Sequence, residues 1–168
     1  MPDQPPTVRE EIRQSKPFRS AAEEAAVALL LTTERLRNHL SDAAEPEGLT
    51  LQQYNVLRIL RGSHPEPLQT LELGSRMLER TPGITRLLDR LESKRLVRRE
   101  RCAEDRRCVH CRITSAGLTL LDRLDRPMRQ AAAAGFRGLD RSAITDLVAR
   151  LDHVRAALRA ASVSAERE

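Results

Sequence analysis

Threonine and arginine side chains at helical spacing near the middle of the chain are suited to hydrogen bonding with nucleic acid. Thr81, Thr85, Arg86 and Arg90 fall within ten residues, and Lys94 follows at the same helical spacing. Arginine has the planar fork that bridges guanine O6 and N7 or a phosphate, and an α-helix fits the major groove of B-DNA. A lone arginine on a helix is more often an ordinary solvated charge, so this interpretation depends on the elements around it.

The same stretch has the pattern of an amphipathic helix. Its apolar positions repeat at helical spacing: Ile84, Leu87, Leu88 and Leu91. The threonines and arginines lie away from this stripe, on the face that is free to meet a groove. Thr81 followed by Pro82 predicts the helix start, because a hydroxyl accepts from an unpaired backbone N–H and proline fits the first helical position. Residues 71–80 form a shorter amphipathic segment, and together the two predict a helix-turn-helix.

A basic β-hairpin is predicted after this helix. Arginines precede a polar tip, and residues 108–114 return as a β-branched and polar run. Arg106 and Arg107 at the tip are candidates for entry into a narrow minor groove, where the potential is most negative. Asp105 is expected to anchor the tip by pairing with an arginine at its base, for which we take Arg99.

The order of these motifs resembles the MarR family of winged-helix regulators. LTLQQYNVLRIL, LELGSRM, TPGITRLLDRLESKRLVRRE and EDRRCVHCRITSAG occur in the family's order, and the match covers about Leu49 to Leu121. The resemblance implies a homodimeric transcription factor, usually a repressor, that binds a pseudo-palindromic operator and is often released by a small ligand or by oxidation. One departure is Arg95, where the family usually has glycine. If that position is left-handed, a non-glycine residue costs on the order of 1 kcal/mol.

Length and composition suit one domain with appended helices. The chain has 168 residues, of which 40% are hydrophobic and 2% aromatic, so its core is built mainly from aliphatic side chains. We expect a mainly α fold with a small β-hairpin wing and dimerisation helices at both ends. The predicted parts are a tail and short helix (1–17), an N-terminal dimerisation helix and linker (18–48), a winged helix-turn-helix domain (49–117) and C-terminal dimerisation helices (118–168).

Capping residues and apolar seams predict the flanking helices. Ser20 with Glu23 and Thr50 with Gln53 have capping-box spacing, and Asp140 can cap the last helix. Seams of mostly apolar residues run along the first and last long helices: Ala22, Ala26, Leu29, Thr33, Leu36, Leu40, Ile144, Leu147, Val148, Leu151, Val154 and Leu158. Each seam could face the chain's own core, but two similar seams favour contact with a second subunit.

The positive charge is concentrated on the predicted DNA-binding segment. Between Arg76 and Arg112 there are twelve Lys and Arg against six Asp and Glu, an excess of +6, while the whole chain carries +5. This is the distribution expected for phosphate neutralisation on double-stranded DNA. No apolar run approaches a membrane span and the N-terminus has no signal-peptide pattern, so we expect a cytoplasmic, nucleoid-associated protein without a membrane partner.

Cys102, Cys108 and Cys111 all fall in the predicted wing. If Val97 faces Ile113 across the hairpin, Cys102 faces Cys108 closely enough for a disulfide. Three interpretations remain open: a thiol switch that distorts the wing on oxidation, a Cys/His metal site that would include His110, or free thiols in a reducing cytoplasm. The free-thiol interpretation is favoured, and strand alternation disfavours a metal site.

Motifs of enzymes are missing from the sequence. There is no P-loop, no dinucleotide-binding glycine pattern, no HExxH and no recognisable nucleophile, so neither an enzyme nor a cofactor is predicted. A small-molecule effector is implied by the resemblance, with no binding residues assigned to it. The alternative from another class is a winged-helix interaction module or adaptor without sequence-specific DNA binding.

Overall fold

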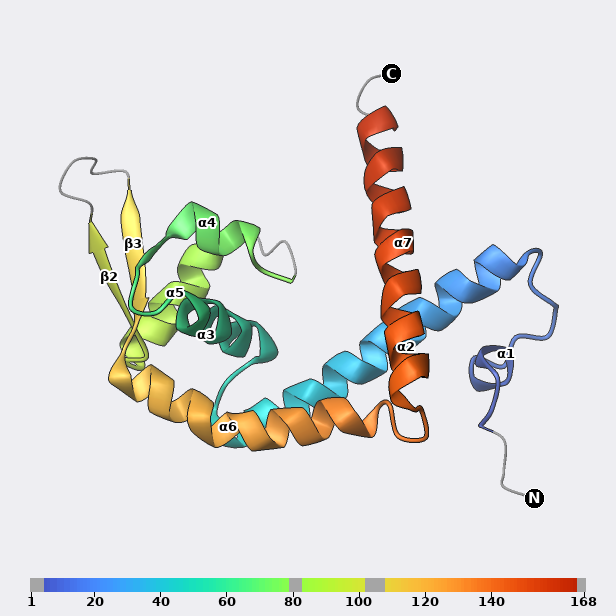
Figure 1. Ribbon diagram of the computed structural model, residues 1–168, viewed down its shortest axis with the longest axis horizontal. Helices are drawn as coiled ribbons and strands as arrows, with labels where there is room; N and C mark the ends of the chain where they lie inside the picture. Colours follow the sequence, from blue (N-terminus) through green and yellow to red (C-terminus); the bar gives the residue numbers. More distant parts are fainter. Residues whose placement is uncertain (1–4, 79–82, 102–107, 166–168) are drawn as a thin grey trace. The chain divides into compact units, whose positions relative to one another are not determined.

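The computed structural model describes residues 5–78, 83–101 and 108–165 of the chain, which forms two compact units, 1–131 and 132–168 (Figure 1). The described helices are α1 (Val8–Glu11), α2 (Ala21–Ala44), the 3-10 helix η1 (Glu45–Glu47), α3 (Leu51–Ser63), α4 (Thr70–Ser75), α5 (Ile84–Ser93), α6 (Ser115–Ala134) and α7 (Arg141–Ala165). The described strands are β1 (Leu68–Gln69), β2 (Val97–Arg101) and β3 (Val109–Ile113). The mainly α class with a small hairpin wing is confirmed.

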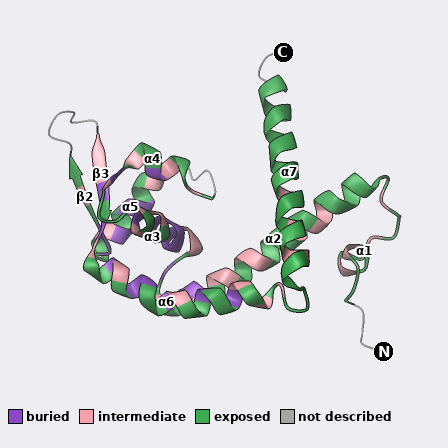
Figure 2. Cartoon of the chain, viewed as in Figure 1, coloured by how far each residue is buried: buried purple, intermediate pink, exposed green. Residues whose placement is uncertain are grey.

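Leucines from four helices form the core of the first unit. Its largest side chains with almost no exposed surface are Leu57, Leu60, Leu73, Leu88, Leu91, Leu121 and Leu124. In Figure 2 the buried positions accordingly gather on α3, α5 and the first part of α6. This packing holds the second helix of the helix-turn-helix, α5, against α3, α4 and the sheet.

The sheet is antiparallel, with β3 between β1 and β2. Val97 pairs with Ile113, so the predicted register is confirmed, and Leu68 pairs with Cys111 as part of β1. Val97, Cys111 and Ile113 are buried, because alternate side chains of each strand face the core. The intervening residues of β2 and β3, Arg98 and Arg112 among them, therefore face outward.

Most of the predicted helix caps are present. Thr50 and Gln53 form a reciprocal capping box, and the Asp140 carboxylate accepts from the Ala143 N–H at 2.8 Å. Ser20 caps α2 by accepting from the Glu23 N–H at 3.1 Å, but the second half of that capping box was predicted wrongly. The Glu23 carboxylate accepts instead from the Arg19 N–H at 2.7 Å, one residue further out.

The start of α5 differs from the prediction. Gly83 occupies the N-cap position with φ of 102°, and the helix begins at Ile84 rather than at Thr81–Pro82. A left-handed residue cannot belong to a right-handed helix, so the glycine sets the boundary. Thr81 and Pro82 lie outside the described residues.

Arg95 ends the same helix in the left-handed conformation, with φ of 59°. The Leu96 N–H donates to the Leu91 carbonyl at 3.0 Å and the Arg95 N–H donates to the Glu92 carbonyl at 2.8 Å. The longer of these bonds spans six residues, as in a Schellman motif, in which glycine usually holds the left-handed position. The arginine is therefore a strained occupant of a glycine position.

We expect Arg95→Gly to stabilise the protein by up to about 1 kcal/mol, because glycine adopts positive φ without the cost of a Cβ. Thermal unfolding followed by circular dichroism measures the effect. Arg98→Gly in the adjoining strand is the matched control: it removes the same side chain at an ordinary backbone conformation and should destabilise. A lower melting temperature for Arg95→Gly would contradict the strain argument.

Two ion pairs attach α6 to the rest of the first unit. Arg61 on α3 binds both carboxylate oxygens of Asp125, at 3.0 and 2.8 Å, and Arg123 binds Glu47 of η1 at 3.2 and 2.8 Å. Hydrogen bonding from Arg61 holds the pKa of Asp125 below its ordinary value. The helix continues through Pro127.

The second unit consists mainly of α7. None of the side chains described along this 25-residue helix is buried, and Figure 2 shows it almost wholly exposed. Its apolar side chains are largely open to solvent: Val148, Val154, Leu158 and Val163. Among the helices of the described segments, none combines the length and apolarity needed to cross a membrane.

Candidate nucleic-acid interface

The polar face of α5 is exposed, as the sequence pattern predicted. Thr85, Arg86 and Arg90 are open to solvent, whereas Leu87 and Leu88 are buried beneath them. The helix is therefore fixed by its apolar stripe and presents hydrogen-bonding side chains outward. An exposed polar helix of this kind can enter a major groove.

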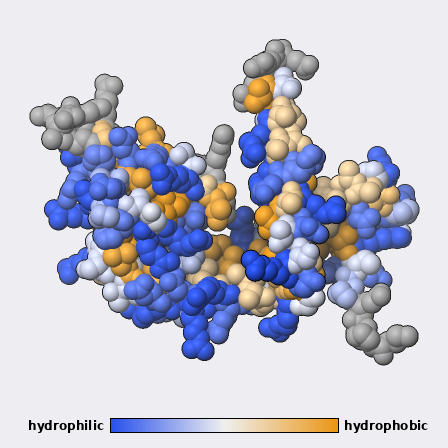
Figure 3. All heavy atoms as spheres, viewed as in Figure 1, coloured by the Kyte–Doolittle hydropathy of each residue, from blue (hydrophilic) through white to orange (hydrophobic). Residues whose placement is uncertain are grey.

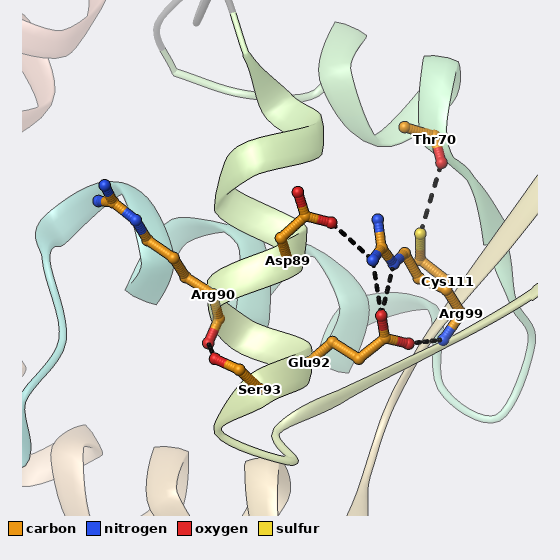
Figure 4. A network of polar contacts seen from close by, with 7 residues as sticks. All are labelled: Thr70, Asp89, Arg90, Glu92, Ser93, Arg99 and Cys111. Carbon is orange, nitrogen blue, oxygen red and sulfur yellow. Dashed lines mark hydrogen bonds and ion pairs between the residues drawn. The ribbon is translucent and has the colours of Figure 1, made fainter.

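Two of the predicted contact residues differ in what surrounds them. Arg90 extends from α5 on the side opposite to Asp89, and its carbonyl accepts a hydrogen bond from the Ser93 hydroxyl at 2.9 Å (Figure 4). Lys94 donates to the carbonyl of Gly48, so its ammonium group lies against the loop before α3. Lys94 thus also has a role inside the fold, linking the end of α5 to that loop.

Arg99 anchors the wing to α5 through two acidic residues of that helix, Glu92 and Asp89. Its Nε and Nη2 atoms donate to Glu92 Oε2 at 2.9 and 2.6 Å, and its backbone N–H donates to Glu92 Oε1 at 3.1 Å. Nη2 also lies 2.6 Å from Asp89 Oδ1. Figure 4 shows the guanidinium between the two carboxylates. The predicted partner, Asp105, lies outside the described residues.

These contacts change the pKa values of the groups involved. Hydrogen bonding from Arg99 lowers the pKa of Glu92, and hydrogen bonding from Glu92 raises the pKa of Arg99. A carboxylate with a lowered pKa in the folded state stabilises the fold above its unfolded pKa and loses that contribution as the pH falls through the folded pKa. The anchor is therefore intact at neutral pH and is lost only in acid.

The sequence did not single out Glu92 or Asp89. Both are acidic residues, three positions apart on α5. The basic strand β2 follows, and Arg99 is its first arginine on the inward-facing side. The available signal was the predicted register: if Val97 faces inward, then Arg99 does so too and lies beside the helix that precedes it. Charge patterning alone could not choose between these acids and Asp105.

The cysteines have different environments. Cys111 is fully buried and free, 3.6 Å from the Thr70 hydroxyl, and burial raises the pKa of its thiol. Cys108 is disulfide-bonded, and its sulfur lies 3.9 Å from His110 Nε2. The free-thiol expectation thus holds for Cys111 and is wrong for Cys108. Within the described ranges, no group of three or more His, Cys, Asp or Glu side chains is arranged to hold a metal ion.

Some predicted site residues lie outside the described residues: Thr81, Cys102, Asp105, Arg106 and Arg107. Their roles as helix-start contact, thiol partner, wing anchor and minor-groove contacts remain predictions. The DNA contacts assigned to Thr85, Arg86, Arg90 and Lys94 are likewise predictions.

A two-helix unit that exposes Thr85, Arg86 and Arg90, backed by a basic antiparallel hairpin, defines a winged-helix protein of the DNA-binding class. The model of the MarR family matches residues 49–109. A MarR transcription factor from Planctomyces limnophilus is 36% identical, with coverage of 83% of this chain and 98% of that one and a TM-score of 0.64. The chain belongs to the MarR family of transcriptional regulators.

Two further relatives agree with this assignment. The regulator MhqR of Bacillus subtilis is 31% identical over 87 residues, which are 52% of this chain and 59% of MhqR. The chain therefore aligns with little more than half of that relative's length. A mutant MarR from Escherichia coli, solved in complex with operator DNA, is 20% identical with a TM-score of 0.73, at coverages of 83% and 99%. That second likeness shows the fold.

Proposed function

We propose that this protein is a homodimeric repressor that binds a pseudo-palindromic operator. The observation that carries the proposal is the geometry of α5: three buried leucines fix the helix, and Thr85, Arg86 and Arg90 project from its exposed side. In this proposal, α5 enters the major groove and the wing reaches the flanking minor groove. The Escherichia coli relative of the same fold was solved in complex with operator DNA, which supports DNA binding as the function of this fold.

Control of DNA binding is proposed to act through the relative placement of the two recognition helices, which are the α5 helices of the two subunits. A small ligand that prefers a spacing of the helices unsuited to DNA would lower operator affinity by the size of that preference. The family membership of the chain supports this mechanism.

The test is binding of the purified protein to its own upstream intergenic DNA and to a scrambled duplex of equal length, over a series of salt concentrations. The proposal predicts tight, sequence-selective binding, with an affinity that falls as salt rises because phosphate contacts release counterions. Equal and weak binding to both duplexes would favour the interaction-module alternative and overturn the proposal.

We expect Arg86→Ala to lower operator affinity by about 10- to 100-fold, and to relax sequence choice, because a bidentate arginine–guanine contact contributes about 1–3 kcal/mol of discrimination. Fluorescence anisotropy with operator and scrambled duplexes measures both effects. Arg126→Ala on α6 is the control, because it removes the same charge from an exposed position away from α5. If both variants lose affinity equally for both duplexes, Arg86 contributes charge and not sequence readout.

Oxidation is a second proposed form of control, supported by the disulfide at Cys108. We expect wild-type operator affinity to fall when reductant is omitted, and Cys108→Ser to bind equally well with and without it, because serine cannot form the bond. Cys111→Ala is the matched control and should keep the wild-type response, since Cys111 is a buried free thiol. A response that persists in Cys108→Ser would exclude this cysteine as the switch.

A further inference from the structure

Glu92, a half-buried residue of α5, accepts three hydrogen bonds from the first wing strand. Its carboxylate accepts from the backbone N–H, Nε and Nη2 of Arg99, while Asp89 contacts Arg99 only at Nη2. The backbone bond matters most, because it fixes the path of strand β2 itself and not only a side chain. Arg99 and Glu92 are partly shielded, with side chains 23% and 38% exposed.

We propose that Glu92 is a positioning residue for DNA recognition, which fixes the first wing strand against α5 so that helix and wing engage DNA in one geometry. The inference rests on the proposed function. In it, Glu92 contributes to DNA recognition without contacting DNA itself. Three hydrogen bonds to one side chain hold a fixed orientation that a single ion pair would not, since each further bond removes a rotational freedom of the pair.

Arg99 also compensates an electrostatic penalty on the recognition helix. Asp89 and Glu92 lie three positions apart on α5, where like charges repel each other and would repel DNA phosphates. The guanidinium of Arg99 lies between them and neutralises part of that charge. Among the described residues, Glu92 and Asp89 on α5 are the charged groups that contact the Arg99 guanidinium. Cys111 of β3 lies close by and is 3.6 Å from the hydroxyl of Thr70 at the start of α4 (Figure 4).

This arrangement gives Glu92 an effect of unexpected sign. Removing an acidic charge from a DNA-binding surface by itself raises affinity for any DNA, because the remaining surface is more positive. If Glu92 positions the wing, its removal instead lowers affinity for the operator, since helix and wing no longer reach their grooves together. The two accounts of the residue therefore predict opposite changes from the same substitution.

The experiment compares Glu92→Gln with the wild-type protein on operator and scrambled duplexes, by fluorescence anisotropy at a temperature where melting curves show both to be folded. We expect operator affinity to fall about tenfold, which corresponds to the free energy of one lost hydrogen bond to a charged group. Affinity for scrambled DNA should stay constant or rise. Glu100→Gln is the matched control. Glu100 is an exposed acid on the outer face of the same strand, paired with Arg98, so its loss should slightly raise affinity for both duplexes.

Arg99→Lys provides a test that does not change net charge. Lysine keeps the positive charge but lacks the planar fork, so the positioning account predicts a loss of operator affinity similar to that of Glu92→Gln. Hydroxyl-radical footprints should lose protection at the flanking minor grooves and keep it over the major grooves. Operator binding by Glu92→Gln that equals or exceeds the wild type would overturn the inference while leaving the proposed function intact. Failure of the wild-type protein to select its operator would overturn the proposed function itself.

Discussion

Replacing Gly117 with alanine is expected to destabilise the protein by about 3 kcal/mol and to lower its melting temperature by roughly 10 °C. A Cβ at this position would lie 2.5 Å from the carbonyl oxygen of Leu96 and 2.7 Å from Cγ1 of Ile113. The first of these atoms belongs to the backbone directly after α5 and cannot move without shifting the base of the wing. The clash therefore requires either α6 or the sheet to move.

Gly62→Ala on α3 is the matched control for this substitution. A Cβ at Gly62 would meet no atom within 4 Å, and alanine is the better helix former by about 0.5–1 kcal/mol, so this variant should be as stable as the wild type or more so. Thermal and urea unfolding of both variants measure the difference. If Gly117→Ala has the same melting temperature as the wild type, the close approach of α6 to Leu96 is not part of the folded structure in solution.

Local patterns predicted the parts of the fold that depend on local chemistry. The stripe of Leu87, Leu88 and Leu91 located the buried face of α5, and the Thr50 capping box located the start of α3. The pairing of Val97 with Ile113 followed from the alternation of inward- and outward-facing side chains along the two consecutive strands of the hairpin. In each case residues close in sequence determine the result, because helix periodicity, capping and strand alternation act over a few residues.

Features that depend on tertiary geometry were predicted less well. The sequence at Thr81, Pro82 and Gly83 offers more than one helix start, and the backbone conformation of Gly83 decides between them. Arg99 has acidic residues on both sides in sequence, and its choice of Glu92 depends on how closely β2 passes α5. Partner selection of this kind is set by distances of a few ångströms between elements, which charge patterning cannot supply.

The C-terminal helix α7 has an apolar stripe that is mostly exposed in the single chain. An isolated helix gains little stability in water from propensity alone, and most helices in proteins are stabilised by burying an apolar face. None of the described side chains of α7 is buried, yet apolar side chains recur along it, as the orange and tan atoms of Figure 3 show. Ile144, Leu147 and Leu151 are partly covered, whereas Val154 and Leu158 are 41% and 62% exposed. A second copy of the chain is the partner that our proposal assigns to this stripe.

We therefore expect Leu158→Asp to dissociate the proposed dimer and to lower operator affinity by at least about 100-fold. Burial of a leucine contributes about 1.5–3 kcal/mol, and a twofold interface loses that contribution twice. Because Leu158 is exposed in the single chain, the substitution should leave the monomer folded, which circular dichroism checks. Light scattering after gel filtration measures the subunit number.

Ala156→Asp places the same charge on the opposite face of α7 and should remain dimeric. A dimer that survives Leu158→Asp would show that subunits meet through another surface, and the selective loss of operator binding in the dissociated variant would show that two recognition helices must act together.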